Sequence, residues 1–400
     1  MRNTRHSYLT HLSCPVCGRT YSVDQLQTYC RDCDSPLLAS YDLPSLKVAR
    51  KPADIRHRPG GMWRWWELLP LLDPACRVTL GEGGTPLVRL DRLGQELGVE
   101  HLWVKEEGLN PTGTFKARGL SSAVSKAREL GAAGLVIPTA GNAGGALAAY
   151  AARAGLPAHV FVPADAPAVH RSEVEQSGGQ LHLVDGLIDQ AGREAAKAAD
   201  DHGWFNLATF REPYRVEGKK TLGLELAEAF EWQLPQVIIY PTGGGTGLVG
   251  MWKAFDELKQ LGWLGGELPR MISVQAEGCA PIVRAIETGA ERAEAWPNAN
   301  TYASGLRVPH AFADRLILQA IRQSGGTAVA VSETEIERAR RQLAEREGLL
   351  VCPEGAASLA GLQRLLQAGA VEADDTVVLF NTGTGLKHLL DDRPLLSQAP

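Results

Sequence analysis

Short strand-like segments alternate with helical segments from about residue 100 onward, and this alternation restricts the fold more than any other feature. The expected strands are β-branched runs at Leu102–Val104, Leu135–Ile137, His159–Val162, Leu181–Val184, Val237–Tyr240, Ile272–Val274, Ala328–Val331 and Val377–Phe380. The expected helices are Phe115–Leu130, Ala143–Arg153, Leu187–Asp201, Lys220–Phe230, Leu248–Leu258 and Glu333–Glu347. Because such alternation produces parallel sheets covered by helices, the sequence predicts an α/β fold.

Charge and hydropathy argue against two classes of partner. The formal net charge is −5, with 44% hydrophobic and 22% charged residues, an ordinary balance for a globular protein. A net negative charge gives no electrostatic reason to bind nucleic acid or an anionic membrane. No apolar run reaches the roughly 18 residues of a membrane span, and the basic start leads into no apolar signal segment. We therefore expect a cytoplasmic protein with neither nucleic-acid nor membrane partner.

Four cysteines near the start form two Cys-x-x-Cys pairs, Cys14 with Cys17 and Cys30 with Cys33. In a reducing compartment, paired cysteines of this kind favour a metal over disulfides. Four thiolates can hold one zinc ion in a closed, structural site. The alternative is four incidental thiols. The pattern predicts a zinc ribbon over residues 1–40, followed at 41–80 by an irregular connector.

A turn leads into the helix that contains Lys116. The segment Asn110-Pro111-Thr112-Gly113-Thr114-Phe115-Lys116 follows an expected strand, and Thr114 can cap the helix. The first helical turn is unfavourable for a charged lysine because the positive end of the helix dipole lies there. The position suits an amine that is kept partly neutral or converted to a Schiff base. The alternative is an ordinary solvated lysine.

Two glycine-rich segments each follow a strand and open a helix. They are Thr139-Ala140-Gly141-Asn142-Ala143 and Pro241-Thr242-Gly243-Gly244-Gly245-Thr246-Gly247. Free N–H groups at such a helix start bind anions, a carboxylate for the first segment and a phosphate for the second. The second is not a Walker loop, since no Gly-Lys-Ser/Thr follows. The alternatives are a tight strand–helix connection for the first segment and a flexible loop for the second.

The last expected strand ends in Asn381-Thr382-Gly383-Thr384-Gly385. Ligands of parallel sheets bind beyond the carboxyl ends of the strands, so the Thr382 hydroxyl can face a ligand. The segment can equally be a simple turn. The sequence contains no His-Glu-x-x-His and no Gly-x-Ser-x-Gly, so it offers neither a zinc-protease motif nor a nucleophilic serine.

The motifs and their order resemble those of the fold-type-II pyridoxal-phosphate (PLP) enzymes, which are similar to tryptophan synthase β, and of the threonine synthase branch in particular. The resemblance runs from Cys14 to Lys387. It also includes Gly81-Glu82-Gly83-Gly84-Thr85-Pro86-Leu87 and Arg215-Val216-Glu217-Gly218-Lys219-Lys220-Thr221. It implies a large parallel-sheet domain of residues 41–117 and 216–400, a small one of residues 118–215, and the cofactor between them.

The resemblance also implies a role for each motif. Lys116 carries the cofactor and moves protons, Asn142 binds its 3′-oxygen, and Thr382 faces its pyridine nitrogen. The residues implied to hold the cofactor phosphate are Gly243, Gly244, Gly245, Thr246 and Gly247. Those implied to bind the substrate carboxylate are Thr139, Ala140, Gly141 and Ala143. The phosphate of such a substrate needs positive charge of its own, for which Arg215, with Lys219 or Lys220, is the candidate set. A neutral hydroxyl at the pyridine nitrogen weakens the electron sink, which favours elimination and replacement over transamination.

The implied reaction converts O-phospho-L-homoserine and water into L-threonine and phosphate, and the expected assembly is a homodimer. Some positions depart from the threonine synthase pattern. Ala117 replaces an Asp, Ala143 replaces a polar residue, and the region of Phe210 lacks the usual Asn-Ser. The Gly-Gly-Gly-Thr-Gly loop is closer to that of threonine and serine dehydratases. A dehydratase releasing ammonia and a 2-oxo acid is therefore the alternative. A non-catalytic PLP or amino-acid sensor is a third, against which the intact Lys116 argues.

Overall fold

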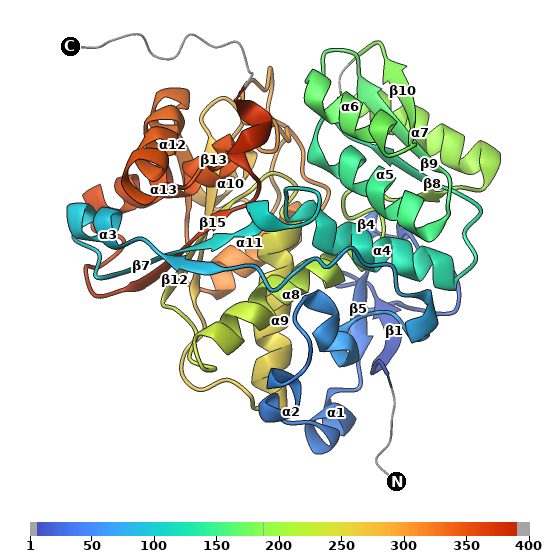
Figure 1. The fold of residues 1–400 in the computed structure, drawn as a ribbon, viewed down its shortest axis with the longest axis horizontal. Helices are drawn as coiled ribbons and strands as arrows, with labels where there is room; N and C mark the ends of the chain where they lie inside the picture. The colour runs from blue at the N-terminus through green and yellow to red at the C-terminus, as the bar shows by residue number, and fades with distance from the viewer. Residues whose placement is uncertain (1–5, 187, 390–400) are drawn as a thin grey trace.

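Two large β-sheets organise the chain, which the computed structural model describes over residues 6–389 apart from residue 187 (Figure 1). One has six strands in the order β14-β13-β12-β15-β7-β6, and the other has four in the order β10-β9-β8-β11. Neighbouring strands are parallel except for the edge pair β6–β7. The six-stranded sheet contains β6 Leu87–Arg89, β7 His101–Glu106, β12 Val237–Pro241, β13 Arg270–Ala276, β14 Ala328–Val331 and β15 Thr376–Asn381. The four-stranded sheet contains β8 Leu135–Pro138, β9 Ala158–Pro163, β10 Gln180–Val184 and β11 Phe205–Asn206.

The predicted α/β class with parallel sheets is confirmed, and every expected strand is present within one or two residues. These strands are recognisable because β-branched side chains pack well on a pleated, buried surface. In these two sheets, the strands that the sequence pattern did not predict are β6 and β11, which have three and two residues. Segments of that length are too short to show a hydrophobic period.

Helices cover both sheets, and Figure 1 shows α5, α6 and α7 around the four-stranded sheet. The bounds are α3 Asp91–Leu97, α4 Lys116–Glu129, α5 Asn142–Ala154, α6 Ala168–Gln176, α7 Ile188–His202, α8 Tyr214–Ala229, α9 Thr246–Leu261, α10 Pro281–Glu287, α11 Asp314–Gln323, α12 Glu333–Glu347 and α13 Pro353–Gln367. Each expected helix is present. The predicted start of α7 at Leu187 lies outside the described residues, and none of the described helices is long and apolar enough to cross a bilayer.

Helix α8 begins at Tyr214, so the predicted start at Lys220 was wrong. Every residue from Tyr214 to Ala227 is buried, including Arg215 and Glu217. A helix that is buried on all sides has no polar face and therefore no 3.6-residue pattern of apolar residues. The first turns of α8 carry charged side chains in the interior, which a sequence pattern assigns to the surface.

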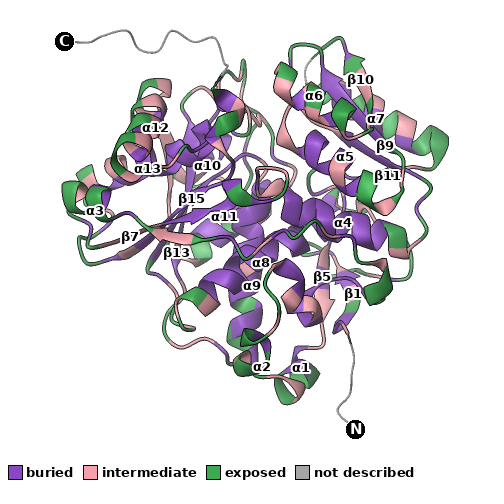
Figure 2. Ribbon diagram, in the orientation of Figure 1, coloured by how far each residue is buried: buried purple, intermediate pink, exposed green. Residues whose placement is uncertain are grey.

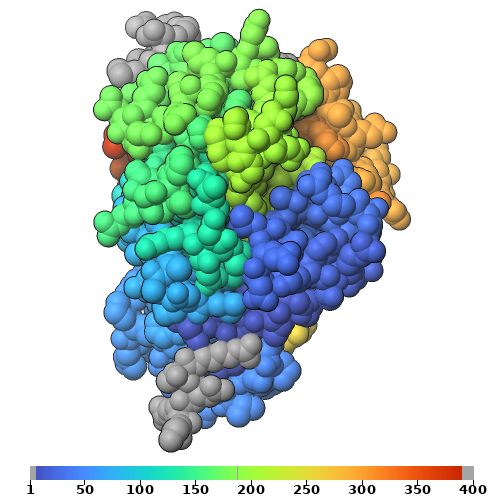
Figure 3. All heavy atoms as spheres, turned by 90° about the vertical axis from the view of Figure 1, so that its right-hand side faces the viewer, coloured from blue at the N-terminus to red at the C-terminus, as the bar shows by residue number. Residues whose placement is uncertain are grey.

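The N-terminal segment forms small antiparallel sheets of β1 Leu9–Ser13, β2 Thr20–Tyr21 and β5 Leu38–Tyr41, and of β3 Tyr29–Cys30 and β4 Ser35–Pro36. Its apolar side chains, including Leu9 and Leu12, belong to the same core cluster as Leu120 in α4 and Leu147 in α5. The ribbon therefore has no core of its own. Figure 3 shows these residues, in blue, packed directly against the green and orange parts of the chain.

The connector at residues 41–80 is more regular than expected. It contains helices α1 Leu43–Ala49 and α2 Pro52–Arg56 and 3-10 helices η1 Met62–Leu68 and η2 Pro74–Cys76. Trp65 is fully buried in a cluster with Leu224 of α8 and Leu258 of α9. The connector therefore covers one side of the α8–α9 pair, and its tryptophans supply the buried area that its short helices lack.

The parallel arrangement brings three loops to one edge of the six-stranded sheet. The loops after β7, β12 and β15 lead to Lys116, Gly243 and Thr382 respectively. Since carboxyl ends of parallel strands lie at the same edge, these residues converge there. Figure 2 shows that β15 and helices α8 and α9 around this edge are largely buried. The smaller sheet uses only residues between 135 and 206. The division into residues 41–117, 118–215 and 216–400 remains a prediction, with the ends of the chain outside the described residues.

Candidate active site

Lys116 begins α4 and is partly exposed. Burial of the amine, together with the positive charge of Arg215, lowers the pKa of Lys116 to about 8. We predicted Thr114 as the helix cap, but Phe115 occupies that position. The Thr114 hydroxyl still accepts a hydrogen bond from the Lys116 N–H at 3.3 Å. A lysine with this pKa has a sizeable neutral fraction near pH 7, as a nucleophile or base requires.

Thr382 lies beside Lys116 because the chain pairs at this point. The Phe115 N–H donates to the Thr382 carbonyl oxygen at 3.0 Å, and Thr114 forms a β-bridge with Gly383. The Thr382 hydroxyl lies 3.6 Å from the sulfur of Cys352, which caps α13. Burial raises the pKa of the Cys352 thiol well above its usual value, so the thiol is neutral. The sequence pattern missed Cys352, since a lone cysteine before a helix carries no signal.

The glycine-rich segment Gly243–Gly247 joins β12 to α9 and is packed too tightly for side chains. A Cβ on Gly243 would lie 2.1 Å from the Gly305 carbonyl oxygen, and one on Gly247 would lie 1.9 Å from the Tyr240 hydroxyl. Gly245 has a φ of +77°, which favours glycine. No side chain caps α9, so its first-turn N–H groups can meet an anion. This loop fits a phosphate group.

Asn142 opens α5, and no side chain caps this helix either. The Thr139 hydroxyl accepts a hydrogen bond from the Gly141 N–H at 3.1 Å, which shapes the turn. The Asn142 Oδ1 accepts a hydrogen bond from Lys387 Nζ at 3.0 Å. Ala143 is buried, and the other residues of the turn are partly exposed. The carboxylate site predicted from sequence at Thr139–Ala143 therefore lies at an uncapped helix start.

Arg215 is buried and lies between Lys116 and the glycine-rich loop. One of its terminal nitrogens donates to the Leu207 carbonyl oxygen at 2.5 Å and lies 3.5 Å from the Thr209 hydroxyl. Thr209 in turn lies next to Gly244, where a Cβ would approach it to 2.8 Å. The Arg215 Nε is buried without a hydrogen-bond partner among the described residues. A buried guanidinium nitrogen without a partner fits a bound anion.

The two lysines after Arg215 take different positions, and their role at the substrate phosphate remains a prediction. Lys220 is fully buried and forms ion pairs with Glu217 at 2.6 Å and Glu257 at 2.9 Å. Lys219 donates instead to the carbonyl oxygen of Phe115. Their positions follow from α8, whose successive residues point in different directions.

The segment Gly81–Leu87 supports helix α4, which begins with Lys116. Glu82 accepts hydrogen bonds from the Tyr150 hydroxyl at 2.6 Å and from the Trp63 indole at 2.9 Å. The Gly84 N–H donates to Glu225, which also pairs with Arg118 at 2.6 Å. Arg118 is fully buried in α4, two residues after Lys116. This motif of the resemblance therefore supports helix α4.

The loop that contains Ser304 and Gly305, which the sequence analysis did not single out, also borders the site. Glu354 accepts a hydrogen bond from the Gly305 N–H at 2.7 Å, and the Gly305 carbonyl packs on Gly243. The Ser304 hydroxyl lies 3.7 Å from the position of a Cβ on Gly141. This loop therefore touches both glycine-rich segments. Only its small residues indicated such a role, and small residues alone occur in many loops.

The four N-terminal cysteines come together as predicted. Their sulfur atoms all lie within 4.8 Å of one another, with separations of 3.3 Å for Cys14–Cys33, 3.4 Å for Cys30–Cys33 and 3.8 Å for Cys17–Cys30. A tetrahedral zinc ion with Zn–S bonds of about 2.3 Å needs sulfurs about 3.8 Å apart. None of the four is in a disulfide. The cluster fits a structural zinc ion.

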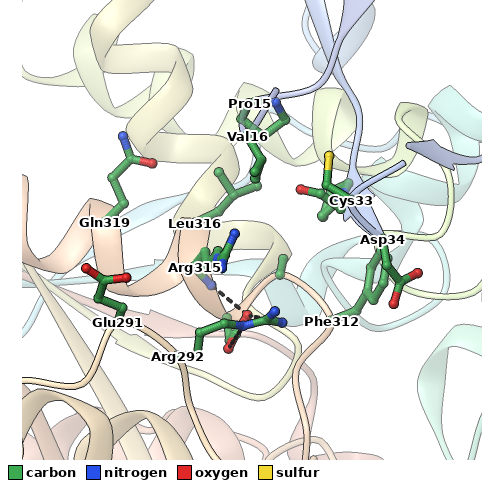
Figure 4. Close-up of a pocket in the computed structure, with 14 residues that line it drawn as sticks. Pro15, Val16, Cys33, Asp34, Glu291, Arg292, Phe312, Arg315, Leu316 and Gln319 are labelled. Atoms are coloured by element: carbon green, nitrogen blue, oxygen red, sulfur yellow. Dashed lines mark hydrogen bonds and ion pairs between the residues drawn. The ribbon is translucent and has the colours of Figure 1, made fainter. Parts of the chain in front are cut away.

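A cavity of about 340 Å³ lies between this ribbon and α11 (Figure 4). Its walls include Val16 and Cys33 on one side and Phe312 and Arg315 on the other. Arg292 at its edge forms an ion pair with Asp314 at 3.2 Å. None of the predicted PLP or substrate residues lines it, so the cavity is separate from the candidate active site.

The residues at the sheet edge fit PLP by their chemistry. Lys116 supplies a partly neutral amine, the start of α9 supplies donors for a phosphate, and Thr382 beside a neutral thiol supplies an uncharged partner for the pyridine nitrogen. Asn142 supplies an amide near the same loops through its bond to Lys387. The cofactor would therefore be held between the edge of the six-stranded sheet and α5.

Comparison with known proteins supports this assignment. The model of a family described as pyridoxal-phosphate-dependent enzyme matches residues 78–383. A threonine synthase from Methanosarcina acetivorans is 38% identical over 384 residues, covering 96% of this chain and 92% of that protein. A threonine synthase from Methanocaldococcus jannaschii is 37% identical, covering 94% and 92%. The structure of maize serine racemase has a TM-score of 0.67 at 24% identity, covering 75% of this chain and 88% of that one. Tomato threonine deaminase isoform 2 has a TM-score of 0.64 at 22% identity, covering 75% and 79%. The chain therefore belongs to the fold-type-II pyridoxal-phosphate-dependent enzymes and, within them, to the threonine synthase family.

Proposed function

We propose that this protein converts O-phospho-L-homoserine and water into L-threonine and phosphate. The observation that carries the proposal is the position of the low-pKa amine of Lys116 close to two anion sites. These are the uncapped start of α9 and the buried Arg215 Nε, which has no hydrogen-bond partner among the described residues. A PLP enzyme with a phosphorylated substrate needs one site for each phosphate. The similarity over 96% of the chain to a protein named threonine synthase supports the same reaction.

Bound PLP supplies an electron sink that stabilises negative charge on the substrate. Lys116 holds the cofactor, and its neutral amine then takes the proton from the substrate α-carbon and returns protons at later steps. The dense surroundings that lower the pKa of Lys116 make this exchange efficient near neutral pH. Phosphate leaves from the γ-carbon, and water adds at the β-carbon.

The remaining residues bind and orient. The uncapped start of α5, at the turn Thr139–Ala143, receives the substrate carboxylate, and Arg215 Nε donates to the substrate phosphate. The glycine-rich loop holds the cofactor phosphate. Thr382, whose hydroxyl lies beside the neutral thiol of Cys352, would offer the pyridine nitrogen an uncharged partner, which would disfavour transamination.

Product analysis separates this function from its alternative. The holoenzyme is offered O-phosphohomoserine, L-threonine and L-serine separately, and phosphate, threonine, ammonia and 2-oxo acid are measured. Equal amounts of phosphate and threonine from O-phosphohomoserine support the proposal. Ammonia and 2-oxo acid from threonine or serine, with no phosphate released from O-phosphohomoserine, would establish the dehydratase instead. No turnover of any of the three would favour the sensor.

We also propose that the protein is a homodimer, as the resemblance implies. Light scattering of the holoenzyme at several concentrations tests this. A mass of twice the chain supports the dimer, and a mass of one chain at all concentrations contradicts it.

A further inference from the structure

Lys387 contacts three oxygen atoms that lie far apart in the sequence. Its Nζ donates to the Thr112 carbonyl oxygen at 2.9 Å and to Asn142 Oδ1 at 3.0 Å, and it pairs with Glu173 Oε1 at 2.5 Å. Only 12% of the Lys387 side chain is exposed. An ammonium group has three protons, so these acceptors satisfy it completely.

These contacts join the two large sheets. Lys387 lies in the 3-10 helix η4, Gly385–His388, just after β15, and Thr112 lies in the loop after β7. Asn142 and Glu173 belong to α5 and α6, which cover the four-stranded sheet. The ammonium therefore bridges the edge that holds Lys116 and Thr382 to the helix that opens with Asn142.

The contact with Lys387 fixes which way the Asn142 amide points. An ammonium group donates and never accepts, so it can face only the amide oxygen. The Asn142 NH₂ group must then point away from Lys387 as a donor. A donor is what the negatively charged 3′-oxygen of PLP requires. With the amide reversed, an oxygen would face that oxygen and repel it.

Glu173 keeps Lys387 in place from the other side. Its Oε2 lies 3.4 Å from His170 Nδ1. A Cβ on Gly145 would lie only 2.8 Å from the same Oε2, so the carboxylate packs closely on α5. Burial opposes ionisation of Glu173, but the contacts with His170 and Lys387 outweigh it and lower its pKa. A partly buried ammonium with an ionised partner is far less costly than an unpaired one.

We propose that Lys387 is a positioning residue that orients the Asn142 amide toward the cofactor and clasps the two sheets together through Glu173. The inference rests on the role of Asn142 in the proposed function. Lys387 itself need not touch cofactor or substrate, because it acts through the two side chains that it holds.

A double-mutant cycle on cofactor affinity tests the first part. Apo-protein is titrated with PLP for the parent, Lys387→Met, Asn142→Ala and the double variant, with the exposed Lys259→Met as control. Lys387→Met is expected to weaken PLP binding about tenfold, which corresponds to one charged hydrogen bond. In the Asn142→Ala background, the same change should have little further effect. An equal tenfold loss in both backgrounds would overturn the inference, because Lys387 would then act without Asn142.

Hydrogen exchange of the apo-protein tests the second part without any cofactor. Lys387→Met and Glu173→Gln should each speed exchange in the first turn of α5 and in α6, while Lys259→Met leaves it unchanged. Parent-like exchange in both variants would overturn the clasp. An Asn142→Ala variant with parent affinity for PLP would overturn the route through Asn142. Neither result affects the product assay, so failure of the inference and failure of the proposed reaction remain distinguishable.

Discussion

The Phe115 N–H donates a hydrogen bond to the Thr382 carbonyl oxygen at 3.0 Å. The residue before Lys116 is thereby tied to the end of β15, although 267 positions in the sequence separate the two. Their strands, β7 and β15, are also neighbours in the sheet, with Glu106 opposite Asn381. The spacing between Lys116 and the Thr382 hydroxyl, which we propose to face the pyridine nitrogen, is therefore set by the sheet.

Replacing Lys116 with Ala should abolish cofactor attachment and turnover. The parent holoenzyme is expected to be yellow, and borohydride should bleach the visible band and fix the cofactor to the peptide that contains Lys116. Lys259→Met, at an exposed site, should behave as the parent. Mass spectrometry of the reduced peptide is the measurement, and a Lys116→Ala variant with parent activity would contradict the assignment.

The rate of cofactor attachment should depend on pH through Lys116. Only the neutral amine attacks an aldehyde, and burial lowers the pKa of Lys116 to about 8. In stopped-flow mixing of apo-protein with PLP, the rate should rise as pH increases from 6 and level off above about 8. An ordinary lysine would still be gaining rate near pH 10. A rate that keeps rising through pH 9 and above would argue against a lowered pKa.

Replacing Arg215 with Gln should change two quantities. The KM for O-phosphohomoserine should rise about ten- to a hundredfold, because a charge-assisted bond to phosphate is lost. The pKa of Lys116 should also rise, because a nearby positive charge is removed, and the attachment profile should move to higher pH. Arg153→Gln, exposed on α5, is the matched control. An unchanged KM, with parent-like thermal stability, would remove Arg215 from the substrate site.

The ribbon should hold one zinc ion per chain. Elemental analysis of protein purified without chelator should find about one equivalent, which Cys33→Ser lowers together with the thermal midpoint. Cys76→Ser, which lies outside the cluster, should change neither. Because the ribbon shares its core with α4 and α5, we expect loss of zinc to destabilise these two helices as well as the N-terminal segment. Metal-free protein of parent stability would show that the thiols are incidental.

Glu106 should make the protein less stable as pH rises toward 7. Burial raises the pKa of Glu106 to about 7, against the hydrogen bonds from Asn381 and Gly108. The folded state then binds more protons than the unfolded state between about pH 4.5 and 7, so the stability that this group contributes is present below pH 4.5 and lost by pH 7. The free energy of unfolding of Glu106→Gln, measured relative to that of the parent, should be roughly 3 kcal/mol higher at pH 8 than at pH 4.5. Urea unfolding at several pH values checks this, and a difference that is constant with pH would contradict it.

The strands and most helices could be read from the sequence because their signals are local. Runs such as Val237–Tyr240 and Val377–Phe380 are apolar, contain β-branched residues and are followed within three residues by glycine, and both form central strands. The glycine-rich segment after β12 likewise indicated a tight turn from its own residues. The start of α8 was not predictable in this way, since Arg215, Glu217 and Lys220 look exposed in the sequence and are buried against partners from other elements.

The sequence by itself determined the fold class, the place of Lys116 at a helix start, the glycine-rich turns before α5 and α9, and the cysteine cluster, because each depends on residues close together in the chain. The tertiary structure alone decided which charged groups reach the site. It turned Lys220 toward Glu257, placed Cys352 beside Thr382, and brought Lys387 to Asn142 across 245 residues. The physical reason is that a buried charge is placed by the partner that offsets its desolvation, and such partners come from distant elements that meet only when the sheets have packed.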